Sequence, residues 1–223
     1  MRNLGIESYL NIFTTLIPVI AGWKSIRVMD NAVKSFWWYI LSAFFVSLSG
    51  GIIYMMRFEN ILLFNLFNFF EAAYLFWLIN QWVLNVSVKK LVSILQILNI
   101  LGFAYLIIYK GQLMMNVSDY DNLRNIVLIP LLAWLTMEIG LNSKVDLLKN
   151  YKFWFIFALL FNLSMIAIHS CMNLWVLSNN QYALHYTIHL LNAANIISYF
   201  LFAKGFICYR HQLNSSGFLQ SLR

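Results

Sequence analysis

The chain has 223 residues, of which 61% are hydrophobic and 10% are charged, and its mean hydropathy is +0.71. Soluble domains average about 25% charged residues, so this composition excludes an ordinary soluble domain. Apolar runs recur along the chain without the short alternating segments of an outer-membrane barrel, which predicts an all-α, multi-pass membrane protein.

We expect a single domain, residues 1–223, built as a bundle of seven transmembrane helices. The expected helices span about residues 6–23, 35–56, 61–82, 90–109, 123–141, 153–177 and 182–208. The first contains Asn11, Thr14, Thr15 and Pro18, and we expect it to pack inside the bundle because polar groups in lipid need protein partners. In the second, the small-residue run at 47–51 predicts close helix packing.

The formal net charge of +7 is distributed unevenly between the two ends of these helices. One end receives most of the basic residues, namely Lys24, Arg27, Lys34, Lys89, Lys90, Lys144, Lys149, Lys152, Lys204, Arg210 and Arg223. The other end receives Arg2, Arg57, Lys110 and Arg124. This positive-inside bias predicts an outside N-terminus and a cytoplasmic C-terminus. It also explains the positive charge without a nucleic-acid partner.

The helix expected at 61–82 carries Asn65, Asn68 and Glu71 at three-residue spacing. Glu71 lies roughly 15–18 Å below the outer surface by helical rise, close to the middle of the bilayer. A charge at that depth is costly unless it is paired, so we expect Glu71 either to be protonated or to have a partner. Glu138, near the inner end of the helix expected at 123–141, is interpreted as a structural group that meets a lysine or water at the interface.

The last two expected helices carry further polar residues. In the seventh, His185, His189 and Asn192 fall within an arc of about 60°. Such a stripe faces protein or a wet cavity rather than lipid. We therefore predict an outward-facing ligand pocket lined by Asn68, Glu71, Asn162, His169, His185, His189 and Asn192. The alternative is that these side chains only form hydrogen bonds between helices.

Zinc binding is a further alternative, with His169, His185 and His189 as ligands. The HxxxH pair of the seventh expected helix resembles one motif of membrane-embedded zinc hydrolases, which include alkaline ceramidases and adiponectin-type receptors. Those families also use a Ser and a His on the second helix and an Asp on the third. Here the second expected helix has serines but no histidine, Glu71 stands in the third, and His169 would supply the third ligand.

A second resemblance covers nearly the whole chain and rests on the runs FNFFEAAYLF, KNYKFWFIFALLFNLS and YTIHLLNAANIISYFLFAKGF. They resemble a family of small seven-helix membrane proteins of Bacteroidota. The positions that match are Phe153, Trp154, Glu71, His189 and Asn192. The resemblance implies the seven-helix fold and a bacterial inner-membrane location, and it implies no activity.

Our leading hypothesis is a non-enzymatic sensor or receptor-like module of the cytoplasmic (inner) membrane, without catalytic residues or a cofactor. It would bind a small ligand or lipid and pass a signal to a separate protein on the cytoplasmic side. Two alternatives remain open. One is an intramembrane zinc-dependent lipid hydrolase, in which Glu71 acts as general base or hydrogen-bonds to the metal ligands without binding the metal itself. The other is a small proton-coupled carrier with Glu71 as the titrating group.

Overall fold

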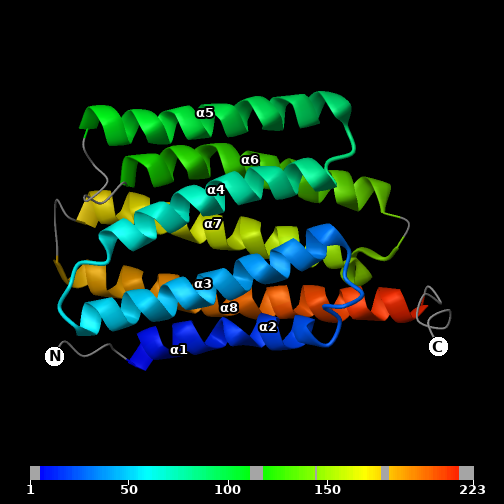
Figure 1. Ribbon diagram of the computed structural model, residues 1–223, viewed down its shortest axis with the longest axis horizontal. Helices are drawn as coiled ribbons and strands as arrows, with labels where there is room; N and C mark the ends of the chain where they lie inside the picture. The colour runs from blue at the N-terminus through cyan, green and yellow to red at the C-terminus, as the bar shows by residue number, and fades with distance from the viewer. Residues whose placement is uncertain (1–5, 111–117, 144, 177–180, 216–223) are drawn as a thin grey trace.

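The computed structural model describes residues 6–110, 118–143, 145–176 and 181–215, and this part of the chain is helical and contains no strand (Figure 1). The helices are α1 (Ile6–Thr14), α2 (Leu16–Trp23), α3 (Asn31–Met55), α4 (Ile61–Trp82), α5 (Val86–Lys110), α6 (Ser118–Asn142), α7 (Tyr151–Val176) and α8 (Gln181–Ser215), with a short 3₁₀ turn, η2 (Leu147–Lys149), before α7.

Six of these helices, α3 to α8, contain apolar stretches of 21 to 27 residues, and a bilayer core needs about 20. Large apolar side chains are also exposed around the bundle, among them Phe45, Ile97 and Ile126. Contiguous apolar surface of this kind is rare on soluble monomers. The prediction of an all-helical chain is confirmed, and the length and hydropathy of the helices indicate a multi-pass membrane protein.

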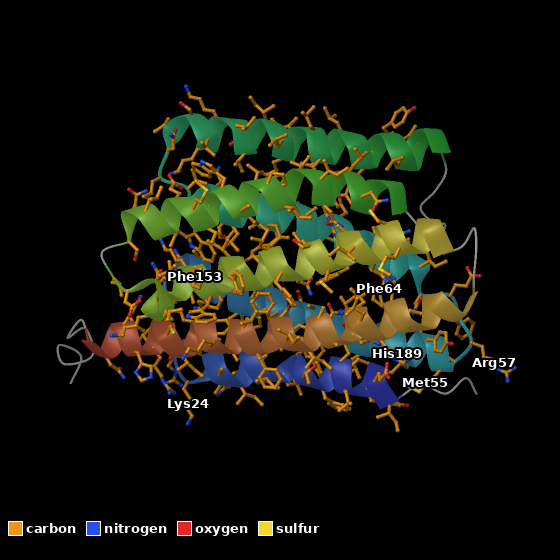
Figure 2. All side chains as sticks on the ribbon, turned by 180° about the vertical axis from the view of Figure 1, so that it is seen from behind. Lys24, Met55, Arg57, Phe64, Phe153 and His189 are labelled. Carbon is orange, nitrogen blue, oxygen red and sulfur yellow. The ribbon has the colours of Figure 1, made fainter. Side chains whose placement is uncertain are left out.

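The helices lie side by side along the long axis of the molecule (Figure 1). α5 forms one edge of the bundle, and α1 and α2 form the opposite edge. α8 packs against α7, α2 and α1, whereas α4 packs against α3, α5 and α6. Figure 2 shows Met55, Arg57 and His189 near one end of the bundle, with Lys24 and Phe153 toward the other. α5 is the least buried of the six long helices.

The first expected helix, at 6–23, is divided into α1 and α2 around Thr15. Pro18 accounts for the division, because it has no N–H to donate to the carbonyl of Thr14 and its ring clashes with that carbonyl. The hydroxyl groups of Thr14 and Thr15 both donate to the carbonyl oxygen of Asn11, at 3.0 and 3.1 Å. The expected helix at 6–23 is therefore present, with an interruption at Thr15 that the sequence analysis did not include.

Several helices begin or end a few residues away from the expected positions. α3 begins at Asn31 instead of 35, because the Asp30 side chain accepts a hydrogen bond from the Val33 N–H at 2.8 Å and caps the helix. α6 begins at Ser118 instead of 123, and α8 continues past 208 to Ser215. Because α6 begins at Ser118, Arg124 lies inside the helix rather than next to its N-terminal end.

Aromatic rings fill the interior of the bundle close to the N-terminal ends of α3 and α7. Phe36 is fully buried, and its ring centroid lies 4.7 Å from that of Phe155, 5.2 Å from Phe202 and 6.3 Å from Phe206. These rings come from α3, α7 and α8. In a bilayer the surrounding lipid is as apolar as the core, so the stabilisation comes from close packing rather than from removal of apolar surface from water.

Glycines allow the closest approaches between these helices. A Cβ on Gly205 of α8 would lie 2.5 Å from the Phe155 ring, and a Cβ on Gly50 of α3 would lie 2.6 Å from Phe64 of α4. The carbonyl of Gly50 also accepts a hydrogen bond from Asn60 at 3.1 Å. The close packing expected for the run at 47–51 is therefore present at Gly50.

Gly205→Ala should destabilise the fold by about 1–3 kcal/mol, because the buried Phe155 ring has no space to move away. Gly140→Ala is the matched control, since no atom lies within 4 Å of its Cβ position. Thermal unfolding of the detergent-solubilised protein measures both. Equal melting temperatures for the two variants would contradict this account of the packing.

Candidate functional site

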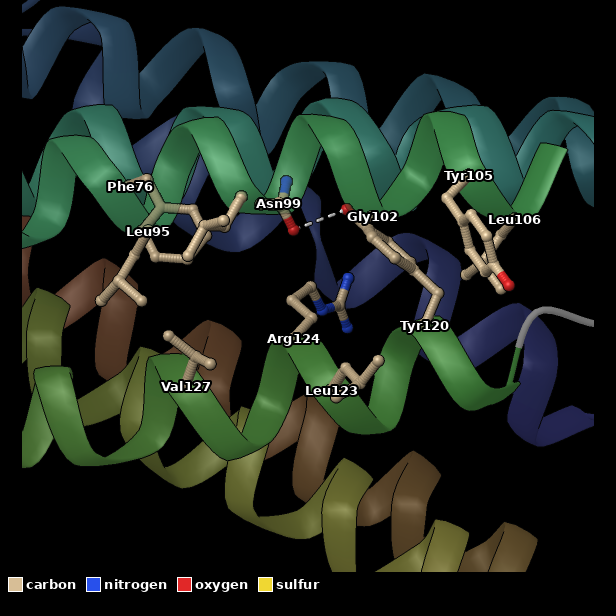
Figure 3. Close-up of a pocket in the computed structure, with 11 residues that line it drawn as sticks. Phe76, Leu95, Asn99, Gly102, Tyr105, Leu106, Tyr120, Leu123, Arg124 and Val127 are labelled. Carbon is tan, nitrogen blue, oxygen red and sulfur yellow. Dashed lines mark hydrogen bonds between the residues drawn. The ribbon is translucent and has the colours of Figure 1, made fainter. Parts of the chain in front are cut away.

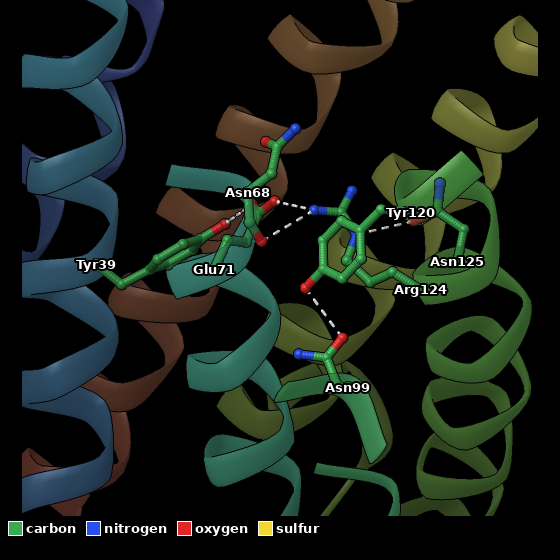
Figure 4. Close-up of polar contacts among 7 residues, drawn as sticks. All are labelled: Tyr39, Asn68, Glu71, Asn99, Tyr120, Arg124 and Asn125. Carbon is green, nitrogen blue, oxygen red and sulfur yellow. Dashed lines mark hydrogen bonds and ion pairs between the residues drawn. The ribbon is translucent and has the colours of Figure 1, made fainter. Parts of the chain in front are cut away.

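A buried ion pair joins α4 to α6 near the middle of the bundle. Arg124 Nη1 lies 2.9 Å from Glu71 Oε2, and the side chains of Arg124 and Glu71 are 2% and 17% exposed (Figure 4). The hydroxyl of Tyr39, on α3, donates to the other carboxylate oxygen of Glu71. Of the two states expected for Glu71, the structure therefore contains the paired one.

The guanidinium group of Arg124 has further contacts within the same cluster. Its Nε donates to Asn125 Oδ1 at 3.4 Å, and its Nη1 lies 3.5 Å from the main-chain carbonyl oxygen of Asn68 (Figure 4). The predicted residue Asn68 thus belongs to this cluster through its backbone. A buried charge is tolerated when it is paired and its remaining hydrogen-bonding groups have partners.

Arg124 is the member of this cluster that the sequence analysis did not include among the candidate site residues. We expected the helix to begin at 123, which placed Arg124 at the membrane edge among the outer basic residues. α6 begins at Ser118, and Arg124 lies six residues later, about 9 Å along the helix axis from Ser118. The run SDYD at 118–121 has the Ser and Asp residues typical of a helix start and could have indicated this boundary.

A cavity of about 480 Å³ lies beside the ion pair, between α4, α5 and α6 (Figure 3). Arg124 forms part of its wall and therefore belongs both to the cavity and to the ion pair. Most of the wall is apolar. The lining residues are Phe76 from α4, Leu95, Leu98, Asn99, Gly102, Tyr105 and Leu106 from α5, and Tyr120, Leu123, Arg124 and Val127 from α6.

Two other polar side chains of the wall are joined across the cavity. The hydroxyl of Tyr120, on α6, donates to Asn99 Oδ1, on α5, at 3.0 Å (Figure 3). Asn99 Nδ2 is buried and has no hydrogen-bond acceptor among the residues that the structure describes. The polar side chains of the wall are thus Asn99, Tyr105, Tyr120 and Arg124, and the lining residues include no carboxylate.

The cavity opens sideways between α5 and α6. Three of its lining residues, Leu98, Tyr105 and Leu123, are 55%, 55% and 62% exposed. All three lie within helices rather than in loops at the ends of the bundle. In a membrane, this side of the bundle would face acyl chains, so a lipid-soluble molecule has direct access to the cavity.

The remaining predicted site residues form separate pairs between helices. Asn162 donates to Asn195 at 2.8 Å, joining α7 to α8, and Asn11 donates to Asn192 at 3.2 Å, joining α1 to α8. His189 contacts the carboxylate of Glu7, again between α8 and α1. These distances match the alternative in which such side chains hydrogen-bond between helices, and none of the predicted residues lines the cavity.

The predicted zinc ligands are only partly described. The side chain of His185 lies outside the described residues, and His169 has a buried Nδ1 on α7. Within the described part of the chain, no group of three or more His, Cys, Asp or Glu side chains is placed to hold a metal ion. The zinc site stays a prediction that depends on His185.

Comparison with known proteins gives no family for this chain. No protein-family model, no curated protein and no solved structure matches it. The resemblance to the seven-helix family of Bacteroidota therefore stays a prediction from the sequence.

Arg124→Met should cost about 3–5 kcal/mol of stability, because it leaves the Glu71 carboxylate buried without its cation. Combining it with Glu71→Gln should restore a large part of that loss, since neither charge is then buried alone. A double-mutant cycle of unfolding in detergent measures the coupling. Additive effects of the two substitutions would contradict a direct interaction.

Proposed function

We propose that this protein is a receptor-like binding module of the bacterial cytoplasmic membrane that takes up a lipid-soluble ligand between α5 and α6. The observation that supports the proposal is the laterally open cavity, with its apolar wall and the Arg124 guanidinium in it. Its volume of about 480 Å³ falls in the range of small-molecule sites, which are mostly apolar with a few polar groups that orient the ligand.

We place the N-terminus outside and the C-terminus in the cytoplasm, as the distribution of basic residues favours. In that orientation the cavity lies in the outer half of the bundle, because it is lined by the C-terminal half of α5 and the N-terminal half of α6. The ligand would enter from the outer leaflet.

The ion pair supplies a physical route from ligand to protein. A ligand that contacts Arg124 would act on the residue that pairs with Glu71. Glu71 in turn accepts a hydrogen bond from Tyr39 on α3. Binding could thus bias the relative positions of α3, α4 and α6, provided that the ligand contacts differ between two arrangements. A signal would pass to a separate protein on the cytoplasmic side.

Gly102→Leu tests the proposal, because the Cβ of Gly102 would enter open space and a leucine would fill the cavity without a clash. In membranes labelled with an alkyl diazirine, we expect saturable cross-links to α5 and α6 that weaken about tenfold in this variant. Gly140→Leu, at another open helical glycine outside the cavity, should label like the wild type. Non-saturable labelling that is unchanged by Gly102→Leu would indicate bulk lipid only and would refute the proposal.

A proton-coupled carrier is the second candidate, and the position of Glu71 favours it. The carboxylate lies deep in the bundle between Arg124 and Tyr39, where protonation would release the arginine. In proteoliposomes loaded with a pH-sensitive dye, a carrier would take up protons when the alkyl probe is added, and Glu71→Gln would abolish this uptake. Glu138→Gln, at an exposed contact with the Leu84 N–H, is the control. Binding of the alkyl probe without proton uptake would contradict the carrier and would favour the receptor-like module.

A further inference from the structure

We infer that a second cavity, at the end of the bundle where α4, α6 and α7 meet, binds a zwitterionic group that carries a primary ammonium and a phosphate, as in the ethanolamine headgroup of a phospholipid. This cavity has a volume of about 130 Å³. It shares no lining residue with the cavity between α5 and α6, so the inference is independent of the proposed function.

The second cavity lies at the depth where a membrane interface is expected. The apolar stretches of α4 and α6 end at Trp82 and Asn142, and that of α7 begins at Tyr151. Phe153 of α7 lies toward the end of the bundle that also contains Lys24 (Figure 2). Phospholipid headgroups occupy the depth at which membrane helices end, so a headgroup is the polar molecule with direct access to this cavity.

The wall of the second cavity is mainly polar, in contrast to that of the first. Five of its eight lining residues are polar or charged, namely Glu138, Asn142, Ser143, Asn150 and Lys152. They come from the end of α6, the segment that follows it and the start of α7. A water molecule takes up about 30 Å³ in the liquid, so a cavity of about 130 Å³ has room for a small polar group rather than for a large ligand.

Two opposite charges line this cavity without forming an ion pair. Glu138, on α6, and Lys152, on α7, are the charged residues among the lining residues that the structure describes, and neither has an ion pair within the described part of the chain. Glu138 Oε2 accepts a long hydrogen bond of 3.4 Å from the Leu84 N–H. Asp30 lies outside the wall and acts on Lys152 only at longer range. A ligand that carries both charges can therefore pair with both residues.

The charged atoms of both residues are accessible. Glu138 Oε1 and Lys152 Nζ have no hydrogen-bond partner among the described residues, and neither belongs to the fully buried polar atoms. The same holds for Trp82 Nε1, although Trp82 as a whole is only 4% exposed. The ammonium of Lys152 and the indole N–H can donate to a phosphate oxygen, and the carboxylate of Glu138 can accept from a ligand ammonium.

The acceptors of the wall favour a primary ammonium over a quaternary one. Asn142 Nδ2 donates to the main-chain carbonyl of Glu138 at 2.9 Å, which leaves the side-chain oxygen of Asn142 as a second acceptor beside the carboxylate. A quaternary ammonium has no N–H to donate and is recognised by several aromatic faces, whereas Trp82 is the one aromatic residue of this wall. A headgroup with a phosphate and no ammonium would leave Glu138 close to a like charge.

Native mass spectrometry of the full chain in detergent tests the inference. Phosphatidylethanolamine, phosphatidylcholine and phosphatidylglycerol with identical acyl chains are added in turn, so that the bound lipids differ only in the headgroup. We expect phosphatidylethanolamine to bind about tenfold more tightly than either of the others, because it alone pairs with Glu138 through N–H donors.

Two variants separate the two ends of the ligand. Glu138→Gln removes the charge that pairs with the ammonium, while its amide oxygen can still accept from the Leu84 N–H, and it should abolish the preference for ethanolamine over choline. Lys152→Met should weaken binding of the ethanolamine and choline lipids alike, since both carry the phosphate. Asp146→Asn and Lys149→Met, at the same end of the bundle but outside the cavity wall, should bind like the wild type.

Soluble headgroups identify the source of the ligand. Glycerophosphoethanolamine should displace the bound lipid more effectively than glycerophosphocholine, and binding as tight as that of the lipid itself would indicate a soluble ligand with the same chemistry. Equal binding of the ethanolamine and choline compounds by the wild type would overturn the inference, whether or not the variants fold. A preference for ethanolamine that Glu138→Gln leaves unchanged would also overturn it.

Discussion

The fold depends on placing one carboxylate deep in an apolar bundle and satisfying it there. Glu71 needs a partner at that depth, because an isolated charge is costly in a medium that cannot solvate it. Arg124 meets the need from α6, and Tyr39 adds a hydrogen bond from α3. These contacts join three helices to one another through one carboxylate.

The cavity is a consequence of this arrangement together with the edge position of α5. α4 contacts both α5 and α6, while the space between α5 and α6 is only partly filled. Gly102 adds to the open volume, and the Asn99–Tyr120 hydrogen bond crosses between the two helices. The same arginine therefore pairs with Glu71 inside the bundle and forms part of the cavity wall, and the proposed effect of a ligand on helix packing depends on this double role.

Polar side chains elsewhere in the bundle have a different role. Asn162 pairs with Asn195, Asn192 pairs with Asn11, and His189 contacts Glu7, so these groups join α7 and α1 to α8. Hydrogen bonds of this type between membrane helices contribute modestly each, and they specify which helices are neighbours. The described part of the polar stripe of α8, His189 and Asn192, thus contacts α1.

The sequence by itself determined the helical class, the approximate helix positions and the requirement that Glu71 be neutral or paired, because hydropathy and helical periodicity are local properties of the chain. It indicated which face of α8 is polar. Only the tertiary structure decided which residues lie opposite these faces. The periodicity of a helix shows which of its faces is polar, but it does not show which helix packs against that face. Arg124 became the partner of Glu71 because α6 begins at Ser118 and packs against α4, and the cavity lies beside this pair because α5 covers the same region incompletely.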